Sequence, residues 1–129
     1  MLDDAVRALA KGPNFAAFTT LLPGGQPMTH VMWIDCDDEH LLVNTEVHRT
    51  KFANVRRDPR VAVAVVDRSD PYHYAEVRGT VVDTVTGPAA RRHIDELSQR
   101  YRGELYRGRI RSERVILRIK PFRQRVANA

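Results

Sequence analysis

Apolar and polar residues alternate along much of the chain with the period of two that is typical of β-strands. Runs rich in valine, isoleucine and aromatic residues are closed by glycine, proline or aspartate. The continuous apolar run at 61–66 predicts a strand that is buried on both faces. The run at 72–86 predicts one long strand with a bend at Gly79. In all, the pattern predicts six strands, at residues 15–22, 28–34, 40–45, 61–66, 72–86 and 115–119.

Apolar residues three or four positions apart predict three short helices between these strands. The middle helix is expected to start at Thr50, whose hydroxyl can cap a first-turn N–H, and to stop at Pro59. The last is expected to begin at Pro88 and to end at Gly103, because proline suits a first turn and glycine a helix end. The predicted helices cover residues 2–10, 50–58 and 88–102.

Six strands at short spacing, with only short helices between them, predict a small antiparallel β-barrel, closed or split. The 129 residues contain no linker-like segment, so we expect a single domain over residues 1–129. An acidic turn is expected at 35–39, and loops are expected at 67–71 and 104–112. The predicted fold class is therefore mainly β with short helices.

The single cysteine, Cys36, excludes an intrachain disulfide, and its aspartate neighbours disfavour a reactive thiolate. We expect it to occupy the acidic turn. The five histidines show no pair at metal-ligand spacing, which argues against a zinc site. No apolar run is long enough to span a bilayer, and the first residues lack the order of a signal peptide. We therefore expect a soluble cytoplasmic protein with no membrane partner.

The net charge of +5 is unevenly distributed along the chain. Residues 1–90 hold 9 Lys and Arg against 12 Asp and Glu, a balance of −3, whereas residues 91–129 hold 12 against 4, a balance of +8. Such a cationic region can attract nucleic acid, an anionic membrane or a polyanionic small molecule. Nucleic acid is the least favoured partner, because only 7% of the residues are aromatic and most of these fall at strand-core positions.

A dense group of cations follows the third predicted strand, and Arg49 and Lys51 lie at the start of the next helix. Helix N-termini carry partial positive charge, so first-turn positions normally favour Asp or Glu over cations. The two cations make sense there if an anion binds, since a phosphate would meet the helix dipole and both charges. A solvated charged helix face is the alternative.

The motif in this region consists of Asn44-Thr45, Arg49-x-Lys51-x-x-Asn54 and residues 57–61. In this order it resembles the split β-barrel flavin and deazaflavin proteins related to pyridoxamine 5′-phosphate oxidase. Further segments are similar to the branch of that family that uses coenzyme F₄₂₀, and with them the resemblance spans about residues 15–119. These segments are residues 18–20, 31–33, 72–79, 92–95 and Tyr101.

The resemblance implies a six-stranded antiparallel split β-barrel that forms a homodimer, with the cofactor in a groove between the protomers. It implies that Arg49 and Lys51 bind the cofactor phosphate, with Asn54 and Thr45 as supporting hydrogen-bond partners. The redox ring would lie across the second strand and its neighbour. The other implied cofactor-binding residues are Val43, Asn44, Thr29, His30, Val31, Met32, Trp33 and Arg57, with Tyr72, Tyr74 and Arg78 from the second subunit.

The resemblance further implies an oxidoreductase that uses the deazaflavin F₄₂₀ to transfer a hydride to an electron-poor unsaturated small molecule. No catalytic side chain is then required, because the cofactor supplies the chemistry and the protein supplies orientation and charge. The oligoglutamate tail of F₄₂₀ would suit the +8 region, since arginine binds carboxylates through two parallel hydrogen bonds. Flavin mononucleotide, FMN, is the alternative cofactor, for an oxidase or a reductase. A non-catalytic protein that binds a cofactor or a haem-related ligand is the other alternative.

Overall fold

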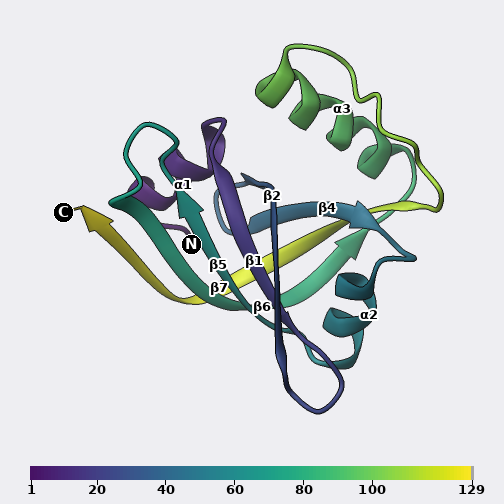
Figure 1. The fold of residues 1–129 in the computed structure, drawn as a ribbon, viewed down its shortest axis with the longest axis horizontal. Helices are drawn as coiled ribbons and strands as arrows, with labels where there is room; N and C mark the ends of the chain where they lie inside the picture. The colour runs from purple at the N-terminus through teal and green to yellow at the C-terminus, as the bar shows by residue number, and fades with distance from the viewer. Residues whose placement is uncertain (129) are drawn as a thin grey trace.

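The computed structural model describes residues 1–128, which form one antiparallel sheet with three helices around it (Figure 1). The helices are α1 (Asp4–Lys11), α2 (Thr50–Arg57) and α3 (Pro88–Arg102). None of these helices is long and apolar enough to cross a membrane. The strands are β1 (Phe15–Leu21), β2 (Pro27–Trp33), β3 (Asp35–Cys36), β4 (Leu41–Glu46), β5 (Arg60–Val66), β6 (His73–Val85) and β7 (Arg114–Asn128).

The sheet is strongly curled, so that strands from its two ends approach each other across a seam (Figure 1). The strand order is β2-β1-β5-β6-β7-β4-β3, and every pairing is antiparallel. β2 is therefore an edge strand, and β4 lies near it without being paired to it. An edge strand presents unpaired N–H and C=O groups. The seam between β2 and β4 thus offers backbone donors and acceptors as well as side chains.

The core lies inside the curl and is built mainly from one face of β1, β4, β5, β6 and the first part of β7. Alternate residues of β1 and β5 are buried. Phe18 of β1 and Val63 of β5 are paired in register, and both lie in the core. Ala62, Ala64 and Val66 of β5 are only half-buried, because they point away from the core. The prediction that this strand is buried on both faces was therefore wrong. At the N-terminus, Leu2, Val6 and Leu9 are buried, as the apolar stripe of the first predicted helix required.

The described residues form seven strands, one more than predicted. The additional strand is β3, whose two residues pair with Leu41 and Leu42 of β4. Cys36 is consequently buried in the core and does not occupy a turn. β7 also continues far beyond its predicted end at residue 119, because its second half pairs with β6. The sequence did not predict this second half, since it is mostly polar and shows no apolar period.

The start of α2 differs from the expectation that Thr50 caps it. The N-cap is Arg49, which has extended backbone angles, and no side chain caps the helix. Thr50 is already the first helical residue, so its hydroxyl does not fill the cap position. The first-turn N–H groups of α2 are therefore left without a side-chain acceptor.

β6 bends at the glycine where the sequence predicted a bend. Its register with β7 shifts between Arg78 and Gly79, and again between Val81 and Asp83. A Cβ atom at Gly79 would overlap the backbone carbonyl oxygen of Lys120. Glycine is needed here because the two backbones approach too closely for any side chain.

The variant Gly79→Ala is expected to lower the free energy of unfolding by about 1–3 kcal/mol, the usual cost of overpacking. The β7 backbone must move to admit the methyl group. Urea unfolding followed by the fluorescence of Trp33 measures the change. Lys120→Ala removes an exposed side chain at the same contact and is the control, with an expected change within about 0.5 kcal/mol. Equal losses for the two variants would contradict the backbone explanation.

Candidate binding site

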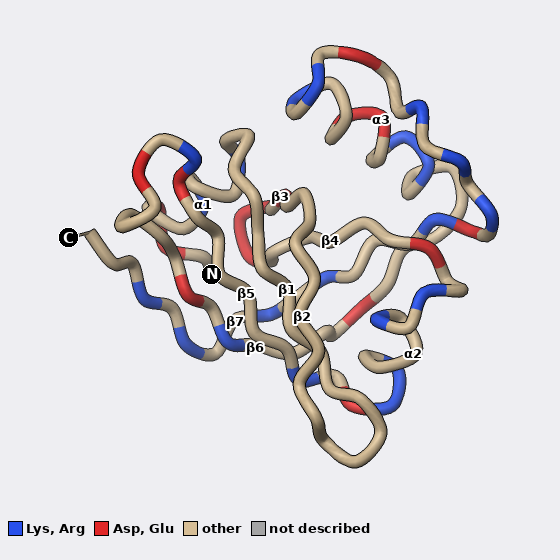
Figure 2. Tube along the Cα trace, viewed as in Figure 1, with Lys and Arg blue, Asp and Glu red and all other residues tan. Residues whose placement is uncertain are grey.

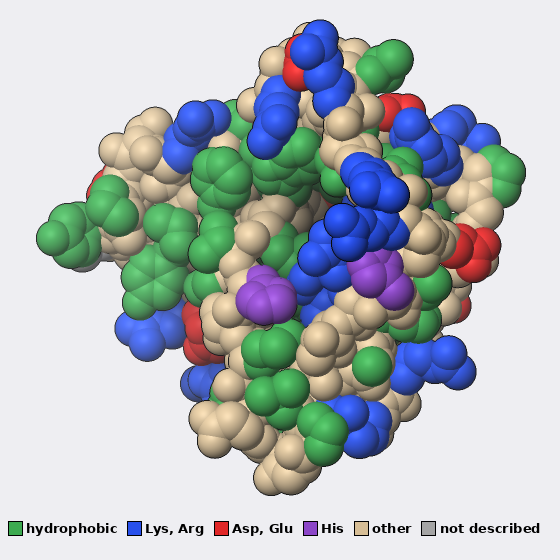
Figure 3. Space-filling model, turned by 45° about the vertical axis from the view of Figure 1, so that its right-hand side comes forward, with side chains coloured by type: hydrophobic (Ala, Val, Ile, Leu, Met, Phe, Trp, Pro, Cys, Tyr) green, Lys and Arg blue, Asp and Glu red, His purple; other side chains and the backbone are tan. Residues whose placement is uncertain are grey.

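A cavity of about 500 Å³ opens at the seam between β2 and β4. It is an open groove, bordered by the start of α2, by α3 and by the segment 103–113 that joins α3 to β7. Figure 3 shows Lys and Arg side chains that run into a hollow with a histidine on either side. The lining residues are Phe15, His30, Val31, Met32, Trp33, Asn44, Thr45, Arg49, Lys51, Ile94, Leu97, Arg102, Tyr106, Gly108 and Arg114.

Lys51 is a buried cation in the wall of this cavity. Its exposed fraction is 8%, and among residues 1–128 no carboxylate or other acceptor contacts its ammonium group. Burial lowers the pKa of Lys51, and the charges of Arg49 and Arg114 lower it further. A largely buried charge without a carboxylate partner costs free energy, because it has lost part of its hydration. This wall is therefore suited to receive an anion.

The backbone at the start of α2 adds to the positive potential. β4 ends at Glu46, and a turn in which the Arg49 N–H donates to the Glu46 carbonyl (3.1 Å) leads into the helix. The first turn of α2 contains no acidic residue, whereas its last turn holds the basic residues that complement the helix dipole. Uncapped N–H groups beside Arg49 and Lys51 make this end of α2 a suitable phosphate contact.

Arg114 is a third cation of the cavity, and the sequence motif did not include it. It is the first residue of β7 and pairs in register with Glu46 of β4. Its Nε donates to Asn44 Oδ1 (2.9 Å), and its Nη1 donates to Glu46 Oε2 (3.4 Å). Burial lowers the pKa of Arg114, although Tyr106 and Glu46 oppose this effect. Arg49, Lys51 and Arg114 thus form the cationic end of the cavity, and of these three Arg114 is paired with a carboxylate, that of Glu46.

Glu46 also fastens the segment 103–113 to the sheet. Its Oε1 accepts hydrogen bonds from the N–H groups of Arg111 (2.6 Å) and Ser112 (2.7 Å). Burial alone would raise the pKa of Glu46, but these N–H groups and the charge of Arg114 lower it. Glu46 is therefore ionised at neutral pH, and it fixes the polypeptide that carries Tyr106 over the cavity.

A chain of buried hydrogen bonds runs behind the cavity from β4 to α3. Asn44 Nδ2 donates to the carbonyl oxygen of Ala90 (3.0 Å) and lies 3.0 Å from His93 Nδ1. The other ring nitrogen, His93 Nε2, lies 2.9 Å from Asp35 Oδ2. Asn44, His93 and Asp35 are all buried. The chain therefore connects a cavity residue to groups that do not reach the cavity.

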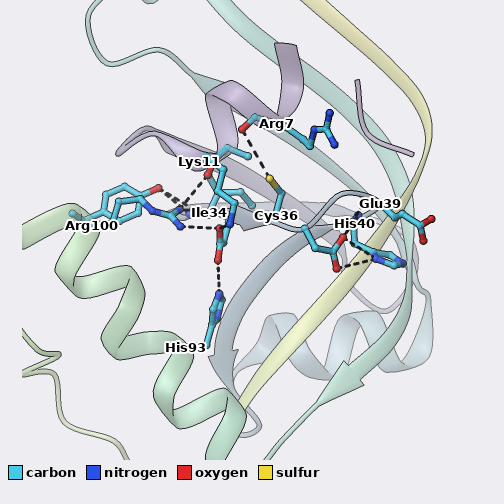
Figure 4. Close-up of polar contacts among 12 residues, drawn as sticks. Arg7, Lys11, Ile34, Cys36, Glu39, His40, His93 and Arg100 are labelled. Carbon is cyan, nitrogen blue, oxygen red and sulfur yellow. Dashed lines mark hydrogen bonds and ion pairs between the residues drawn. The ribbon is translucent and has the colours of Figure 1, made fainter. Parts of the chain in front are cut away.

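Asp35 is the anchor of this chain. Figure 4 shows His93, Arg100 and Lys11 converging on one carboxylate. Arg100 Nη2 and Lys11 Nζ donate to Asp35 Oδ1 at 2.8 and 3.0 Å. Burial would raise the pKa of Asp35, but the hydrogen bonds from His93, Arg100 and Lys11 outweigh it and hold the pKa far below its usual range. The carboxylate thus ties α1 and α3 to β3.

The other end of the cavity is aromatic. Trp33 stacks on Tyr101 with a centroid distance of 5.1 Å and an interplanar angle of 9°, and Tyr106 meets Trp33 edge-on at 6.2 Å. Arg102 lies 5.5 Å from the centre of the Trp33 ring, and Arg114 lies 5.4 Å from that of Tyr106. Aromatic and guanidinium groups of this kind offer flat contact surfaces. The cavity therefore combines a cationic end with an end suited to a planar ring.

The structure brings together eight of the residues that the sequence suggested. These are His30, Val31, Met32, Trp33, Asn44, Thr45, Arg49 and Lys51.

The other suggested residues do not line this cavity. Val43 is fully buried in the core, and Thr29 Oγ1 is hydrogen-bonded to Thr19 Oγ1 (2.7 Å). Asn54 and Arg57 hold α2 against β1, with Asn54 Nδ2 donating to Thr20 Oγ1 (2.9 Å) and Arg57 Nη2 to the Leu21 carbonyl (2.6 Å). Tyr72, Tyr74 and Arg78 lie on β6 or just before it, away from the seam.

A curled antiparallel sheet with a cationic cavity at its seam defines the split β-barrel class of cofactor-binding proteins. Residues 2–126 match the family described as "Pyridoxamine 5'-phosphate oxidase", and the chain belongs to that family. The family and the split-barrel fold that the sequence suggested are thereby confirmed. Membership places the chain among flavin-type oxidoreductases.

Solved structures show the same fold. An F₄₂₀ reductase matches with a TM-score of 0.84 and 31% identity over 96% of this chain and 98% of that chain. A conserved hypothetical protein from Mycobacterium tuberculosis matches with a TM-score of 0.75 and 23% identity, over 99% of this chain and 86% of that one. General Stress Protein 26 from Bacillus anthracis matches with a TM-score of 0.72 and 18% identity, over 96% and 92%. The last two similarities concern the fold alone.

Proposed function

We propose that the protein is a reductase that binds coenzyme F₄₂₀ in the cavity at the β2–β4 seam. The observation that carries the proposal is the largely buried Lys51 side chain in the cavity wall, whose ammonium has no carboxylate partner in residues 1–128 and lies beside Arg49 and Arg114. A phosphate group would supply the missing negative charge and accept hydrogen bonds from all three side chains. The 31% identity to a solved F₄₂₀ reductase favours this cofactor.

The ring of the cofactor fits the remainder of the cavity. The open edge of β2 offers backbone N–H and C=O groups to a heterocycle, and Met32, Trp33 and Tyr106 supply flat or apolar walls. When bound, F₄₂₀ supplies a hydride from its central ring carbon. The protein orients the ring, excludes water and leaves space for an electron-poor unsaturated small molecule beside it.

Exposed arginines suit the tail of the cofactor; Arg102 lines the cavity and the others lie outside its lining. Arg102, Arg107, Arg109 and Arg111 lie at the end of α3 and in the segment 103–113, where Figure 2 shows basic positions along the trace. Only Arg107 among these four has a carboxylate partner in residues 1–128, Glu104 at 3.3 Å. An oligoglutamate chain that leaves the cavity would meet these guanidinium groups, which bind carboxylates through paired hydrogen bonds.

The proposal includes a homodimer. Phe15, Val31, Tyr72 and Phe122 are large apolar side chains with 44–72% of their surface exposed. A second protomer would cover such residues. In this assembly Tyr72, Tyr74 and Arg78 of the second protomer complete the cofactor site.

Titration of the purified protein with F₄₂₀, followed through the fluorescence of the cofactor, tests the proposal. We expect saturable quenching by colourless protein and tighter binding of F₄₂₀ than of FMN. The matching activity is oxidation of reduced F₄₂₀ when an electron-poor enone is added. Protein that is purified yellow with bound FMN and ignores F₄₂₀ would contradict the choice of cofactor.

FMN is a second candidate because of the charge in the cavity wall. At the end of the cavity next to α2, the cations of Arg49, Lys51 and Arg114 against the carboxylate of Glu46 leave 3 − 1 = +2, and Arg102 adds a fourth cation at the aromatic end. The phosphate monoester of FMN is close to a dianion at neutral pH, whereas the phosphodiester of F₄₂₀ carries one charge. Competition between the two cofactors at several salt concentrations separates the candidates, since screening weakens the tail contacts of F₄₂₀ most.

A further inference from the structure

The guanidinium of Arg114 is held in one orientation at the cavity. Nε and Nη1 are engaged by Asn44 and Glu46, which leaves the Nη2 group outside these two contacts. The side chain is 8% exposed and lines the cavity together with Lys51. Because a guanidinium is a rigid fork, fixing Nε and Nη1 also fixes the direction of Nη2.

The pairing of Asn44 with Arg114 determines how the Asn44 amide is turned. Arginine has only donors, so the atom that faces Arg114 Nε must be the Asn44 carbonyl oxygen. The Asn44 amino group then faces the Ala90 carbonyl and His93 Nδ1, both at 3.0 Å. If the Asn44 amide were rotated by 180°, its amino group would face the Arg114 Nε–H. Two donors would then face each other, which is unfavourable in a buried site.

The same logic fixes the tautomer of His93. Nδ1 accepts from the Asn44 amino group and therefore carries no proton. Nε2 then carries the proton and donates to Asp35 Oδ2 at 2.9 Å. Asp35 is held in turn by Arg100 and Lys11. Every link from Asp35 to Arg114 thus has one direction, and neither His93 nor Asp35 lines the cavity.

We infer that Arg114 is an anion-binding residue of the cavity and that His93, held by Asp35, is a positioning residue that sets the Arg114 guanidinium through Asn44. The inference rests on the proposed function only in that the physiological anion is the cofactor phosphate. Outer groups that orient a binding side chain typically change affinity by about tenfold to a hundredfold when they are removed.

Inorganic phosphate is the first probe, because it tests the anion site without assuming a cofactor. NMR titration of the Arg114 Nε–H signal with phosphate should show a saturable shift in the wild-type protein. Arg114→Lys keeps the charge but loses the fork, and we expect about tenfold weaker binding. The assignment of Arg114 as an anion-binding residue is overturned if its wild-type signal does not shift with phosphate. It is also overturned if Arg114→Lys binds phosphate as tightly as the wild type does.

The positioning role of His93 has its own measurement. ¹⁵N NMR of the wild-type imidazoles should show His93 with its proton on Nε2, and a proton on Nδ1 would overturn the chain of hydrogen bonds. His93→Phe should weaken phosphate binding about tenfold or more, and His93→Asn should restore part of it, because its amide oxygen can accept from Asn44. His40→Phe, which removes a histidine paired with Asp37 outside the cavity, is the control and should bind as the wild type does.

A double-mutant cycle separates positioning from general damage to the fold. In the Arg114→Lys background the Asn44–Arg114 geometry is already lost, so adding His93→Phe should cause little further loss of phosphate affinity. If the two substitutions reduced phosphate affinity by independent factors that multiply in the double variant, the positioning role of His93 would be overturned. F₄₂₀ titration of the same wild-type protein keeps the two proposals apart. Phosphate binding through Arg114 without F₄₂₀ binding would refute the proposed cofactor and leave this inference standing.

Discussion

Replacing Arg49 with alanine and Lys51 with methionine should weaken binding of F₄₂₀ at least about a hundredfold. In the proposed complex each side chain contributes a charge-assisted contact to the phosphate, worth roughly 1.5–3 kcal/mol. Fluorescence titration of the variant measures the loss. The same variant should be no less stable than the wild type in urea, because burial and neighbouring cations already lower the pKa of Lys51 and make its charged form costly.

The matched control removes two cations from the same region without touching the cavity. Arg56 and Arg60 are exposed and do not line it. The variant Arg56→Ala with Arg60→Ala changes the net charge equally, so its affinity should fall by only a small, salt-sensitive factor. Similar losses in both double variants would mean that the cations act through the overall field, and the local phosphate site would then be wrong.

Replacing Asp35 with alanine should lower the free energy of unfolding by about 3–5 kcal/mol, the usual cost of breaking a buried charged network. Three donors, on His93, Arg100 and Lys11, would lose their shared acceptor. The loss of unfolding free energy should lie near the lower end of this range, because the Lys11 side chain is 55% exposed and its ammonium can be hydrated when Asp35 is absent. Urea unfolding measures it. Asp38→Ala removes an exposed carboxylate from the neighbouring turn and should cost less than about 1 kcal/mol.

The network also predicts a pH dependence of stability. The pKa of Asp35 in the folded protein lies well below its value of about 3.9 in an unfolded chain. Its contribution is therefore fully present above that value and is lost as the pH falls below it toward the folded pKa. Wild-type stability should decline between about pH 5 and pH 2 more steeply than that of Asp35→Asn, whose side chain does not titrate. Parallel curves would contradict the role of Asp35.

Local signals in the sequence were sufficient for many elements. α3 begins at Pro88 and ends before Gly103, as predicted, because both ends are marked by residues with restricted or unusual backbone geometry. Arg49 and Lys51 could be recognised because cations are unfavourable at the start of a helix. The sequence could not reveal β3, whose two residues are strand only because β4 lies beside them.

The rest of the site depends on contacts between distant parts of the chain. Arg114 reaches the cavity because β7 pairs with β4, which aligns it with Glu46 across nearly seventy positions of sequence. His93 was visible only as one residue of a similar segment, and its role emerges from its place between Asn44 and Asp35. The +8 balance of residues 91–129 predicted an anion-binding region but did not identify which arginines line the cavity.

The strand order has a consequence for how the protein acquires its ligand in the cell. β4 has β7 on one side and only the two-residue β3 on the other. A ribosome that has released residues 1–113 has therefore produced every part of the proposed phosphate contact except the strand that holds β4 in place and contributes Arg114. We therefore expect the proposed cofactor to bind only after β7 has been translated, and not to act as a template for the folding of the nascent chain.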